Sequence, residues 1–339
     1  MARFDVVIAG EANLDLLLYG LPEDLPLERE LLADAMHFAL GGSSAITAHN
    51  LAALGCRVGF ISRTADDAFA GMACSELANM GVDLSRTVAA RPGMKTGVSV
   101  LLEHGDTRRT LTYPGTTATL QFADLDLEYI RSARHLHLSS YFLQRDLQPD
   151  VARLLRFCKE QGMSVSLDPN DDPSGEWGAA FLELLPWVDV LMPNERELCH
   201  LAHEDDVEQA VERISQRVPL LVVKRGRRGA IAVRGMERVA VPALVVASVD
   251  AVGAGDSFNA GFLFGYLRHW GLERCVHLGN SAGAFSTTAA GGTLAFRNRA
   301  ALAAFLERNG EPLLEAQTSP SLNVFPDKNP VSEKEVFES

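Results

Sequence analysis

The sequence predicts an α/β protein with a mainly parallel central sheet and a second, smaller β layer. Three observations lead to this prediction. Short apolar runs alternate with amphipathic segments along most of the chain, as strands and helices do around a parallel sheet. Glycine follows several of the expected helices, where a left-handed residue commonly ends a helix. Two alternating, β-rich runs at 97–103 and 109–113, separated by His104-Gly105-Asp106, predict a hairpin that interrupts this rhythm.

The individual elements follow from their local patterns. The first strand is the apolar run 4–9, which ends at Gly10. The segment 32–40 fits either a strand or a helix. The other expected strands are 58–62, 134–140, 164–168, 188–192, 220–224 and 230–234, and the expected helices are 45–54, 147–161, 177–184, 196–202, 207–217 and 258–267.

The composition is that of an acidic globular protein. Among 339 residues, Lys and Arg number 31 and Asp and Glu 44, which gives a net charge of −13. This charge disfavours nucleic acid and anionic membranes as partners, and no run reaches the ~20 apolar residues of a membrane span. The five cysteines form no Cys-x-x-Cys pair, which indicates reduced thiols in a cytoplasmic protein. The N-terminal run is more typical of a strand than of a signal peptide.

The stretch richest in potential chemistry runs from Asp250 to Phe258. Gly253 and Gly255 flank Ala254, so the backbone there can point several N–H groups at one anion, and the following helix adds its positive end. We expect Asp256 to be ionised in this positive field and able to accept a proton from an alcohol. A base beside an anion hole is what phosphoryl transfer to a hydroxyl requires. The alternative is that Asp256 only caps the helix.

Further polar residues follow expected strands, at the edge of a parallel sheet where ligands bind. Asn13 and Asp15 alternate along the chain, so in an extended segment they share one face and could bind hydroxyls. The alternative is a pair of Asx-turn residues. The adjacent Gly41 and Gly42 allow another molecule to approach the backbone closely, and Ser43 could cap the helix that follows.

Three segments allow two interpretations each. Glu197, three residues after Asn194, could hold a metal-bound water near phosphates, although an Asn cap with a first-turn Glu is a commoner pattern. The four cations from Lys224 onward could bind ATP phosphates or form a solvated hairpin tip. Asn280 could read the edge of a flat ring, or its small-residue helix could simply pack closely on the sheet. A Walker-type loop is absent, and Phe258 stands at the third glycine position of the dinucleotide fingerprint.

These motifs resemble those of the ribokinase-like (PfkB) carbohydrate kinases. The stretch 250–258 is similar to the family's C-terminal signature, 41–55 to its N-terminal signature, and 194–197 to its Asn-x-x-Glu element. The motifs occur in the family's order, and the resemblance spans about residues 5–300. It implies a three-layer ribokinase-like sandwich with a small β-sheet lid that often makes homodimer contacts. It also implies transfer of the ATP γ-phosphate to a hydroxyl of a small sugar, with Mg²⁺.

The resemblance further implies roles for individual residues. Asp256 would be the base, and the amides of Gly253, Ala254 and Gly255 the anion hole. The nucleotide side would comprise Asn194, Glu197 (toward Mg²⁺ through water), Lys224, Gly226, Gly229 and, at the adenine, Asn280. The sugar side would comprise Asn13, Asp15, Gly41 and Gly42. The site of a monovalent cation such as K⁺, present in some members, would comprise Asp250, Val252, Ser286, Ala289 and Gly291.

The resemblance divides the chain into a core of residues 1–14, 43–94 and 117–316, a lid of 15–42 and 95–116, and a flexible tail of 317–339. Ala251 replaces a usual Thr, and Ile46 replaces a hydroxyl-binding Asn of several sugar kinases, which argues against ribose. Asp168-Pro169-Asn170 resembles the ketodeoxygluconate kinase branch, but Asp171 and Asp172 follow where an Arg is usual and would repel an acidic sugar. We therefore expect a neutral sugar substrate. The alternatives are a nucleoside kinase and a non-catalytic sugar- or nucleotide-binding regulator.

Overall fold

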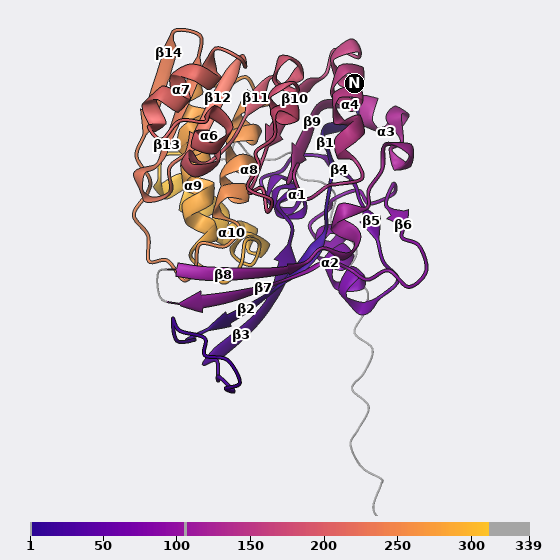
Figure 1. Ribbon diagram of the computed structural model, residues 1–339. Coiled ribbons are helices and arrows are strands. Elements are labelled where there is room, and N and C mark those ends of the chain that lie inside the picture. Colours follow the sequence, from indigo (N-terminus) through magenta and orange to yellow (C-terminus); the bar gives the residue numbers. More distant parts are fainter. Residues whose placement is uncertain (1, 105–106, 312–339) are drawn as a thin grey trace, which may run out of the picture.

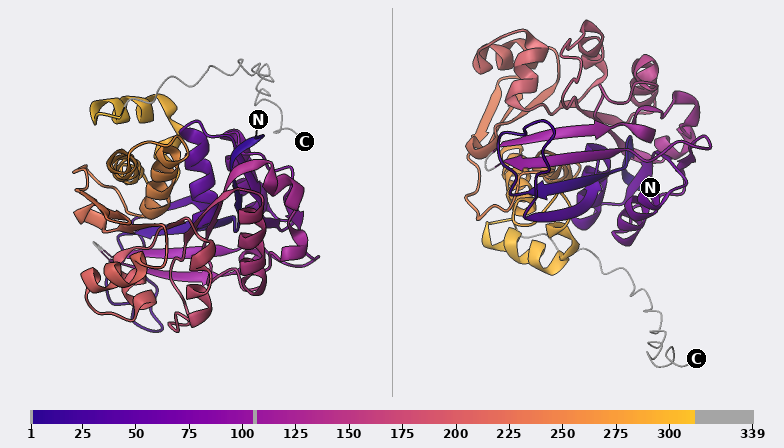
Figure 2. Two further views of the ribbon diagram at one scale, coloured as in Figure 1. Left: turned by 90° about the horizontal axis from the view of Figure 1, so that it is seen from above. Right: turned by 60° about the horizontal axis from the view of Figure 1, so that its bottom comes forward.

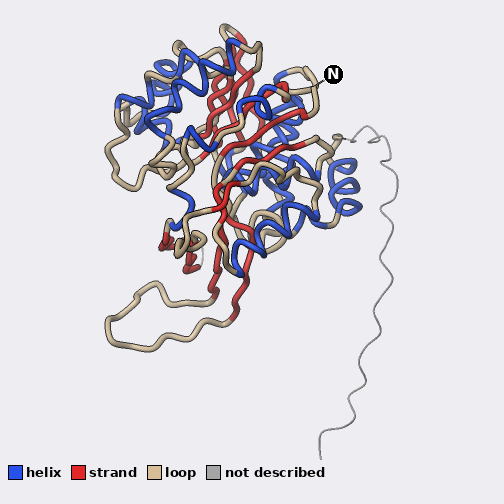
Figure 3. Tube along the Cα trace, turned by 90° about the vertical axis from the view of Figure 1, so that its right-hand side faces the viewer, coloured by secondary structure: helices blue, strands red, loops and turns tan. Residues whose placement is uncertain are grey.

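The computed structural model describes residues 2–104 and 107–311. Its body is an eight-stranded sheet in the order β14-β13-β12-β11-β10-β9-β1-β4, with helices on both faces (Figure 1). Adjacent strands from β12 to β4 are parallel, and β13 and β14 complete the sheet in antiparallel pairs. A four-stranded sheet, β3-β2-β7-β8, extends away from this body (Figure 3). We call it the lid sheet.

The strands and helices have the following bounds. The strands are β1 (Phe4–Ala9), β2 (Asn13–Tyr19), β3 (Ala35–Gly41), β4 (Val58–Ile61), β5 (Arg63–Thr64), β6 (Val88–Ala89), β7 (Val98–His104), β8 (Thr107–Tyr113), β9 (Ala133–Ser139), β10 (Ser164–Asp168), β11 (Val190–Leu191), β12 (Leu220–Lys224), β13 (Ala230–Arg234) and β14 (Glu237–Val241). The helices are α1 (Ser43–Ala53), α2 (Ala68–Asn79), α3 (Leu127–Arg131), α4 (Val151–Glu160), α5 (Ala179–Leu182), α6 (Glu195–Ala202), α7 (Val207–Ser215), α8 (Ala254–Tyr266), α9 (Leu272–Ser286) and α10 (Arg299–Arg308).

Two apolar layers enclose the central sheet. In β1, Val6 and Ile8 pack in one layer with residues of α1, α2, α8, α9 and α10. Val7 and Ala9 point to the other face and pack with residues of α3, α4, α6 and α7. Because a strand between two helix layers buries both faces, β1 is apolar without alternation.

The predicted α/β architecture and the β7–β8 hairpin are confirmed. The ambiguous segment 32–40 forms the strand β3. The helix predicted at 177–184 is reduced to α5, because Trp177 is left-handed (φ 47°) and Gly178 precedes the first helical residue. The helix predicted at 258–267 begins earlier, at Ala254.

The sequence predicts neither a membrane-spanning helix nor a disulfide. No helix among the described residues is both long and apolar enough to cross a membrane. All five cysteines lie within the described ranges, and none is part of a disulfide. The tail predicted at 317–339 lies outside the described residues.

Candidate active site

The first turn of α8 is at the centre of the site. Gly253 is its N-cap and is left-handed (φ 69°), a conformation that glycine adopts without strain. A side chain at Gly253 would also collide with the loop that follows α9, because the ideal Cβ position lies 2.4 Å from the Cα of Gly292. The glycine-framed stretch is therefore the N-cap and first turn of the helix, and not a turn that precedes it.

This placement decides which amides can bind an anion. The N–H of Ala254 donates to the carbonyl of Ala251 across a long 3.3 Å. Among the described residues, no backbone acceptor pairs with the N–H groups of Gly253, Gly255 or Asp256. Unpaired N–H groups at a helix start form an anion-binding site with the positive end of the helix. The amides of Gly253 and Gly255 thus fit the predicted anion hole better than that of Ala254, and Asp256 adds a donor.

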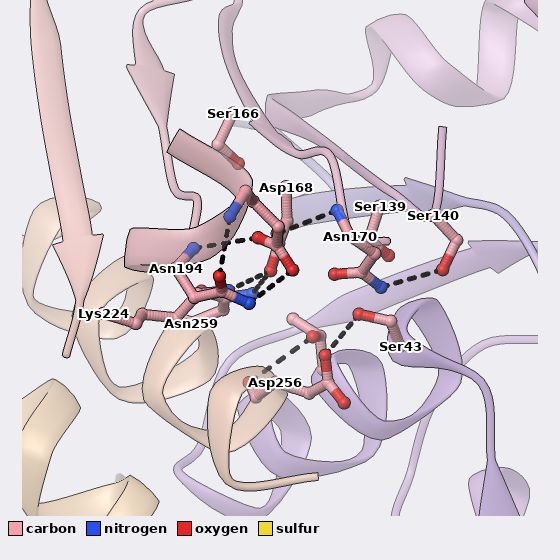
Figure 4. A network of polar contacts seen from close by, with 12 residues as sticks. Ser43, Ser139, Ser140, Ser166, Asp168, Asn170, Asn194, Lys224, Asp256 and Asn259 are labelled. Carbon is pink, nitrogen blue, oxygen red and sulfur yellow. Dashed lines mark hydrogen bonds and ion pairs between the residues drawn. The ribbon is translucent and has the colours of Figure 1, made fainter. Parts of the chain in front are cut away.

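Asp256 and Ser43 point toward each other from the first turns of α8 and α1 (Figure 4). The Ser43 hydroxyl donates to Oδ1 of Asp256. Burial raises the pKa of Asp256, although the Ser43 hydrogen bond and Lys224 act against this rise. Burial therefore acts against the ionisation that the helix end and the Ser43 hydrogen bond favour. Ser43 is also not a cap, because Gly42 is the N-cap of α1 and no side chain caps that helix.

A buried ion pair lies beside this turn. Nζ of Lys224, at the end of β12, contacts Oδ2 of Asp168, at the end of β10, and Nδ2 of Asn259 donates to the same oxygen at 2.5 Å (Figure 4). Asp168 and Glu197 outweigh the effect of burial and raise the pKa of Lys224, so its ammonium stays charged. Nζ lies 3.6 Å from the ideal Cβ position of Gly255. The cation is thus close to the anion hole.

The Asn194–Glu197 pair forms a capping box at the start of α6. The Asn194 side chain accepts the N–H of Glu197 at 2.9 Å, and Glu197 Oε2 accepts the N–H of Asn194 at 2.8 Å. Burial and Asp168 raise the pKa of Glu197 to about 7. The backbones of Asn194 and Lys224 also form an isolated parallel β-bridge. This bridge brings Asn194 and Glu197 to the edge of the site. Each Glu197 oxygen retains lone-pair capacity, so the pair fits both a structural role and a metal-bound water.

Two arginines of the cationic segment that follows Lys224 share one carboxylate. Arg225 and Arg228 both pair with Glu195, the former at 2.8 Å. Gly226 and Gly229 are left-handed in φ (55° and 86°), which shapes the short turn between β12 and β13. Among these cations, Lys224 lies beside the first turn of α8, whereas Arg225 and Arg228 are directed to Glu195.

Asn280 is buried at the position predicted for the adenine side. Its Nδ2 donates to the carbonyls of Val241 and Pro242 at 3.0 and 3.1 Å. These bonds join α9 to the end of β14 and occupy both amide hydrogens. Only its side-chain oxygen is left to accept a hydrogen bond from a ligand.

The predicted sugar residues come together where the lid sheet meets the body. Asn13 and Gly41 are paired in β2 and β3, and Asp15 follows two residues along. Side chains at the two glycines would collide with Asp15 Oδ1 (2.2 Å from the Cβ position of Gly41) and with Asn13 Oδ1 (2.5 Å from that of Gly42). Burial and the nearby Asp256 raise the pKa of Asp15 to about 7. The charge of Asp256, the candidate base, therefore influences the ionisation of Asp15.

Two residues beneath the sugar side have structural tasks. Glu11, unnoticed in the sequence, accepts hydrogen bonds at 2.7 Å from the hydroxyls of Ser44 and Ser140, which fixes the start of α1 against the end of β9. Ile46 is only 2% exposed, and its Cδ1 lies 3.3 Å from the ideal Cβ position of Gly253. Ile46 thus supports the anion-hole turn from below.

Two of the residues predicted for a monovalent cation, Val252 and Gly291, contact Asp250. Its carboxylate accepts the N–H groups of Val252 at 2.8 Å and Gly291 at 2.9 Å, and the Tyr19 hydroxyl at 2.6 Å. Ser286 ends α9, and its carbonyl accepts the N–H of Ala289 at 3.4 Å. No group of three or more His, Cys, Asp or Glu side chains that could hold a metal occurs in the described ranges.

Asp171 and Asp172, expected to repel an acidic sugar, each have a partner in the protein that the sequence did not reveal. Asp172 accepts hydrogen bonds from Ser174 and from the N–H of Trp177 at 2.8 Å, so it stabilises a local turn. Asp171 is exposed and pairs with Arg196 at 3.2 Å. Both carboxylates thus have partners within the protein.

A carboxylate, a buried ammonium and unpaired helix N–H groups at the carboxyl ends of parallel strands are typical of an α/β phosphotransferase. The sequence model described as pfkB family carbohydrate kinase matches residues 3–299. The chain belongs to this family and is a carbohydrate kinase with a ribokinase-like fold.

Relatives with assigned activities cover nearly the whole chain. An ATP-dependent ribose-1-phosphate kinase of Halopiger xanaduensis is 33% identical over 309 residues, 89% of this chain and 97% of the relative. A Vibrio cholerae O395 fructokinase, solved with fructose, ADP and calcium, has a TM-score of 0.74 at 27% identity, covering 89% of this chain and 99% of its own. Adenosine kinase from Sinorhizobium meliloti has a TM-score of 0.77 at 26% identity, covering 88% and 99%.

Proposed function

We propose that this carbohydrate kinase transfers the γ-phosphate of ATP to a hydroxyl of a small neutral sugar, with Asp256 as the base. The observation that supports this most is the convergence of three groups at one helix turn. They are the Asp256 carboxylate, the unpaired N–H groups of Gly253 and Gly255, and the Lys224 ammonium. A proton acceptor and donors for a developing negative charge are thereby adjacent.

The residues of this chain have separate tasks in the proposed reaction. Asn13 and Asp15 hold the sugar hydroxyls, and Gly41 and Gly42 leave room for the side chains of Asp15 and Asn13. Asp256 accepts the proton of the sugar hydroxyl while the oxygen of that hydroxyl bonds to the γ-phosphorus. The bond between the γ-phosphorus and ADP breaks in the same step. Bound ATP with Mg²⁺ supplies the phosphoryl group and partly neutralises its charge. Glu197 would face that metal through water, and Asn280 would lie at the adenine.

A neutral sugar is favoured by the charges of the pocket. Burial and the neighbouring carboxylates of Asp256, Asp250 and Glu11 raise the pKa of Asp15, so an anionic sugar would meet several like charges there. Arg108 of β8 acts in the opposite sense on Asp15. Because the Halopiger relative is named for ribose 1-phosphate, a phosphorylated sugar is the second candidate.

We also propose a homodimer through the outer face of the lid sheet. Alternation along the paired strands places Leu16, Phe38 and Leu111 on this face. Phe38 is 43% and Leu111 60% exposed, and Met36 and Tyr113 are similarly open. The lid sheet lies across the front of the molecule in the right-hand view of Figure 2. An apolar face of this kind on a soluble kinase is typical of an interface, and a second copy offers the matching surface.

The proposed substrate class is tested with ADP release and product mass over a panel of neutral sugars, sugar phosphates, sugar acids and nucleosides. We expect the highest kcat/KM with a neutral sugar, together with a product one phosphate heavier. Preferred turnover of a sugar phosphate or a nucleoside would overturn the neutral-sugar assignment and retain the kinase. Failure of every panel member to yield a phosphorylated product would count against the proposed reaction itself.

A further inference from the structure

The carboxylate of Asp250 is almost saturated with hydrogen bonds. Oδ2 accepts two, from the Tyr19 hydroxyl at 2.6 Å and the Gly291 N–H at 2.9 Å, and Oδ1 accepts the Val252 N–H at 2.8 Å. Asp250 is 8% exposed, and these three donors are neutral groups. A carboxylate has about four lone-pair positions, so only one of its acceptor directions remains.

The three donors come from three separate parts of the fold. Tyr19 ends the lid strand β2, Val252 precedes the N-cap of α8, and Gly291 lies in the loop after α9. The contact is supported by packing, because Leu17 and Leu101 of the lid sheet form a small apolar cluster with Val252. Asp250 therefore joins the inner face of the lid to the turn that carries the anion hole.

Some members of the family resembled by this sequence place a monovalent cation at the position of Asp250. Here Oδ2 has no free lone pair, so a cation bound to that oxygen would have to displace the Tyr19 hydroxyl or the Gly291 amide. The residues present therefore do not fit a cation at Oδ2. We infer that the Tyr19 hydroxyl takes the place that a monovalent cation would occupy at Oδ2 of Asp250, so that K⁺ is not needed to order this carboxylate.

The same bond makes Tyr19 a positioning residue for the proposed reaction. Tyr19 and Asp15 are four residues apart on β2, so they face the same side of the lid sheet. Asp15 lies at the sugar side, and Tyr19 is bonded to the residue that orders the turn before Gly253. The hydroxyl thus fixes the position of the sugar-binding strand β2 relative to the anion hole. This role rests on the proposed function, whereas the replacement of the cation does not.

Tyr19→Phe is the direct test because it removes only the hydroxyl. Melting temperatures of the ligand-free protein are measured in KCl, NaCl and choline chloride at equal ionic strength. We expect the wild-type Tm to be the same in all three salts. Without the hydroxyl, Oδ2 regains an acceptor position, so Tyr19→Phe should melt at a lower temperature in choline and recover specifically in K⁺. This measurement needs no turnover, so it remains valid if no sugar is phosphorylated.

The kinetic part of the test uses the best sugar of the panel. Tyr19→Phe should raise the KM for the sugar about tenfold in choline chloride, the loss typical of a hydrogen bond to a charged group. K⁺ should bring the KM of the variant part of the way back to the wild-type value, and kcat should change less than KM. Tyr129→Phe is the matched control, because it removes a hydroxyl that donates to Asp83 at 3.0 Å on the far side of the core. It should lower Tm without any dependence on the cation.

Two results would overturn the inference. One is a K⁺-specific rise in Tm or kcat of the wild-type protein, which is decisive even if Tyr19→Phe fails to fold. The other is a Tyr19→Phe variant with wild-type KM and no difference between K⁺ and choline.

Discussion

The Ser43 hydroxyl donates a hydrogen bond to the Asp256 carboxylate and thereby connects the first turns of α1 and α8. The two residues are separated by 213 positions in sequence. One helix contributes the proposed base, and the other contributes the donor that favours its ionised form. The contact between the two helix starts consequently influences the pH range in which Asp256 can act.

Replacing Ser43 with Ala should shift the acid limb of the kcat/KM profile to higher pH. Burial raises the pKa of Asp256 and the Ser43 hydrogen bond lowers it, so removing the bond lets the pKa rise further. A base must be ionised, so activity should fall about tenfold at acidic pH and less at alkaline pH. The check is a full pH profile of both proteins. An equal loss at every pH would mean that Ser43 does not act through the ionisation of Asp256.

Replacing Lys224 with Met should strongly destabilise the fold as well as lower kcat. The Asp168 side chain is 0% exposed, and the substitution leaves it without its ammonium partner. Removing one partner of a buried pair typically costs about 3–5 kcal/mol. Urea unfolding of Lys224→Met and of the double variant Asp168→Asn/Lys224→Met provides the measurement. The double variant should recover part of the stability but none of the activity, and an equally unstable double variant would contradict this explanation.

Replacing Asp15 with Asn should stabilise the protein at alkaline pH while weakening sugar binding. Burial raises the pKa of Asp15 from its usual 3.8 to about 7. Between these values the folded protein keeps a proton that the unfolded chain releases, so this group makes stability fall as pH rises and has its full effect above pH 7. The full effect is up to about 4 kcal/mol. Unfolding free energies at pH 4 and pH 8 should therefore show the gain of Asp15→Asn only at pH 8. Lower stability of the variant at pH 8 would refute the assigned shift.

Replacing Leu111 with Asp should convert the proposed dimer into a monomer. The side chain is 60% exposed on the outer face of the lid sheet, so a charge there would be buried at the interface. Light scattering after size exclusion measures the mass of both proteins. Met236→Asp is the control, since Met236 is fully exposed but lies between β13 and β14, on the body. A wild-type monomer, or a dimer that survives Leu111→Asp, would exclude this interface.

The sequence was sufficient to predict the architecture and the neighbourhood of the site, because both depend on local patterns. Alternating apolar segments indicated the parallel sheet, and an expected strand end placed Asn13 and Asp15 at its edge. The partners were harder to predict. Lys224 pairs with Asp168 across 56 residues, and Ser43 with Asp256 across 213. Periodicity shows which strands end at one edge, but it does not show which side chains meet there.

Burial was the second property that local sequence did not reveal. The positive end of α8 suggested an easily ionised Asp256, whereas burial dominates and raises its pKa. A similar limit applies to Asp171 and Asp172, because their partners Arg196 and Trp177 could not be inferred from local pattern. Tyr19 carried no signal beyond its place at the end of an alternating strand, because its partner Asp250 is 231 residues away.

The most direct test of the proposed chemistry is single-turnover phosphoryl transfer by Asp256→Asn with saturating ATP and sugar. Asparagine retains the shape of the side chain and its place beside Ser43, but it cannot accept the proton of the acceptor hydroxyl. We predict a rate at least ~10²-fold below that of the wild-type protein, with unchanged ATP affinity. An Asp256→Asn protein that transfers phosphate at the wild-type rate would show that Asp256 is not the base.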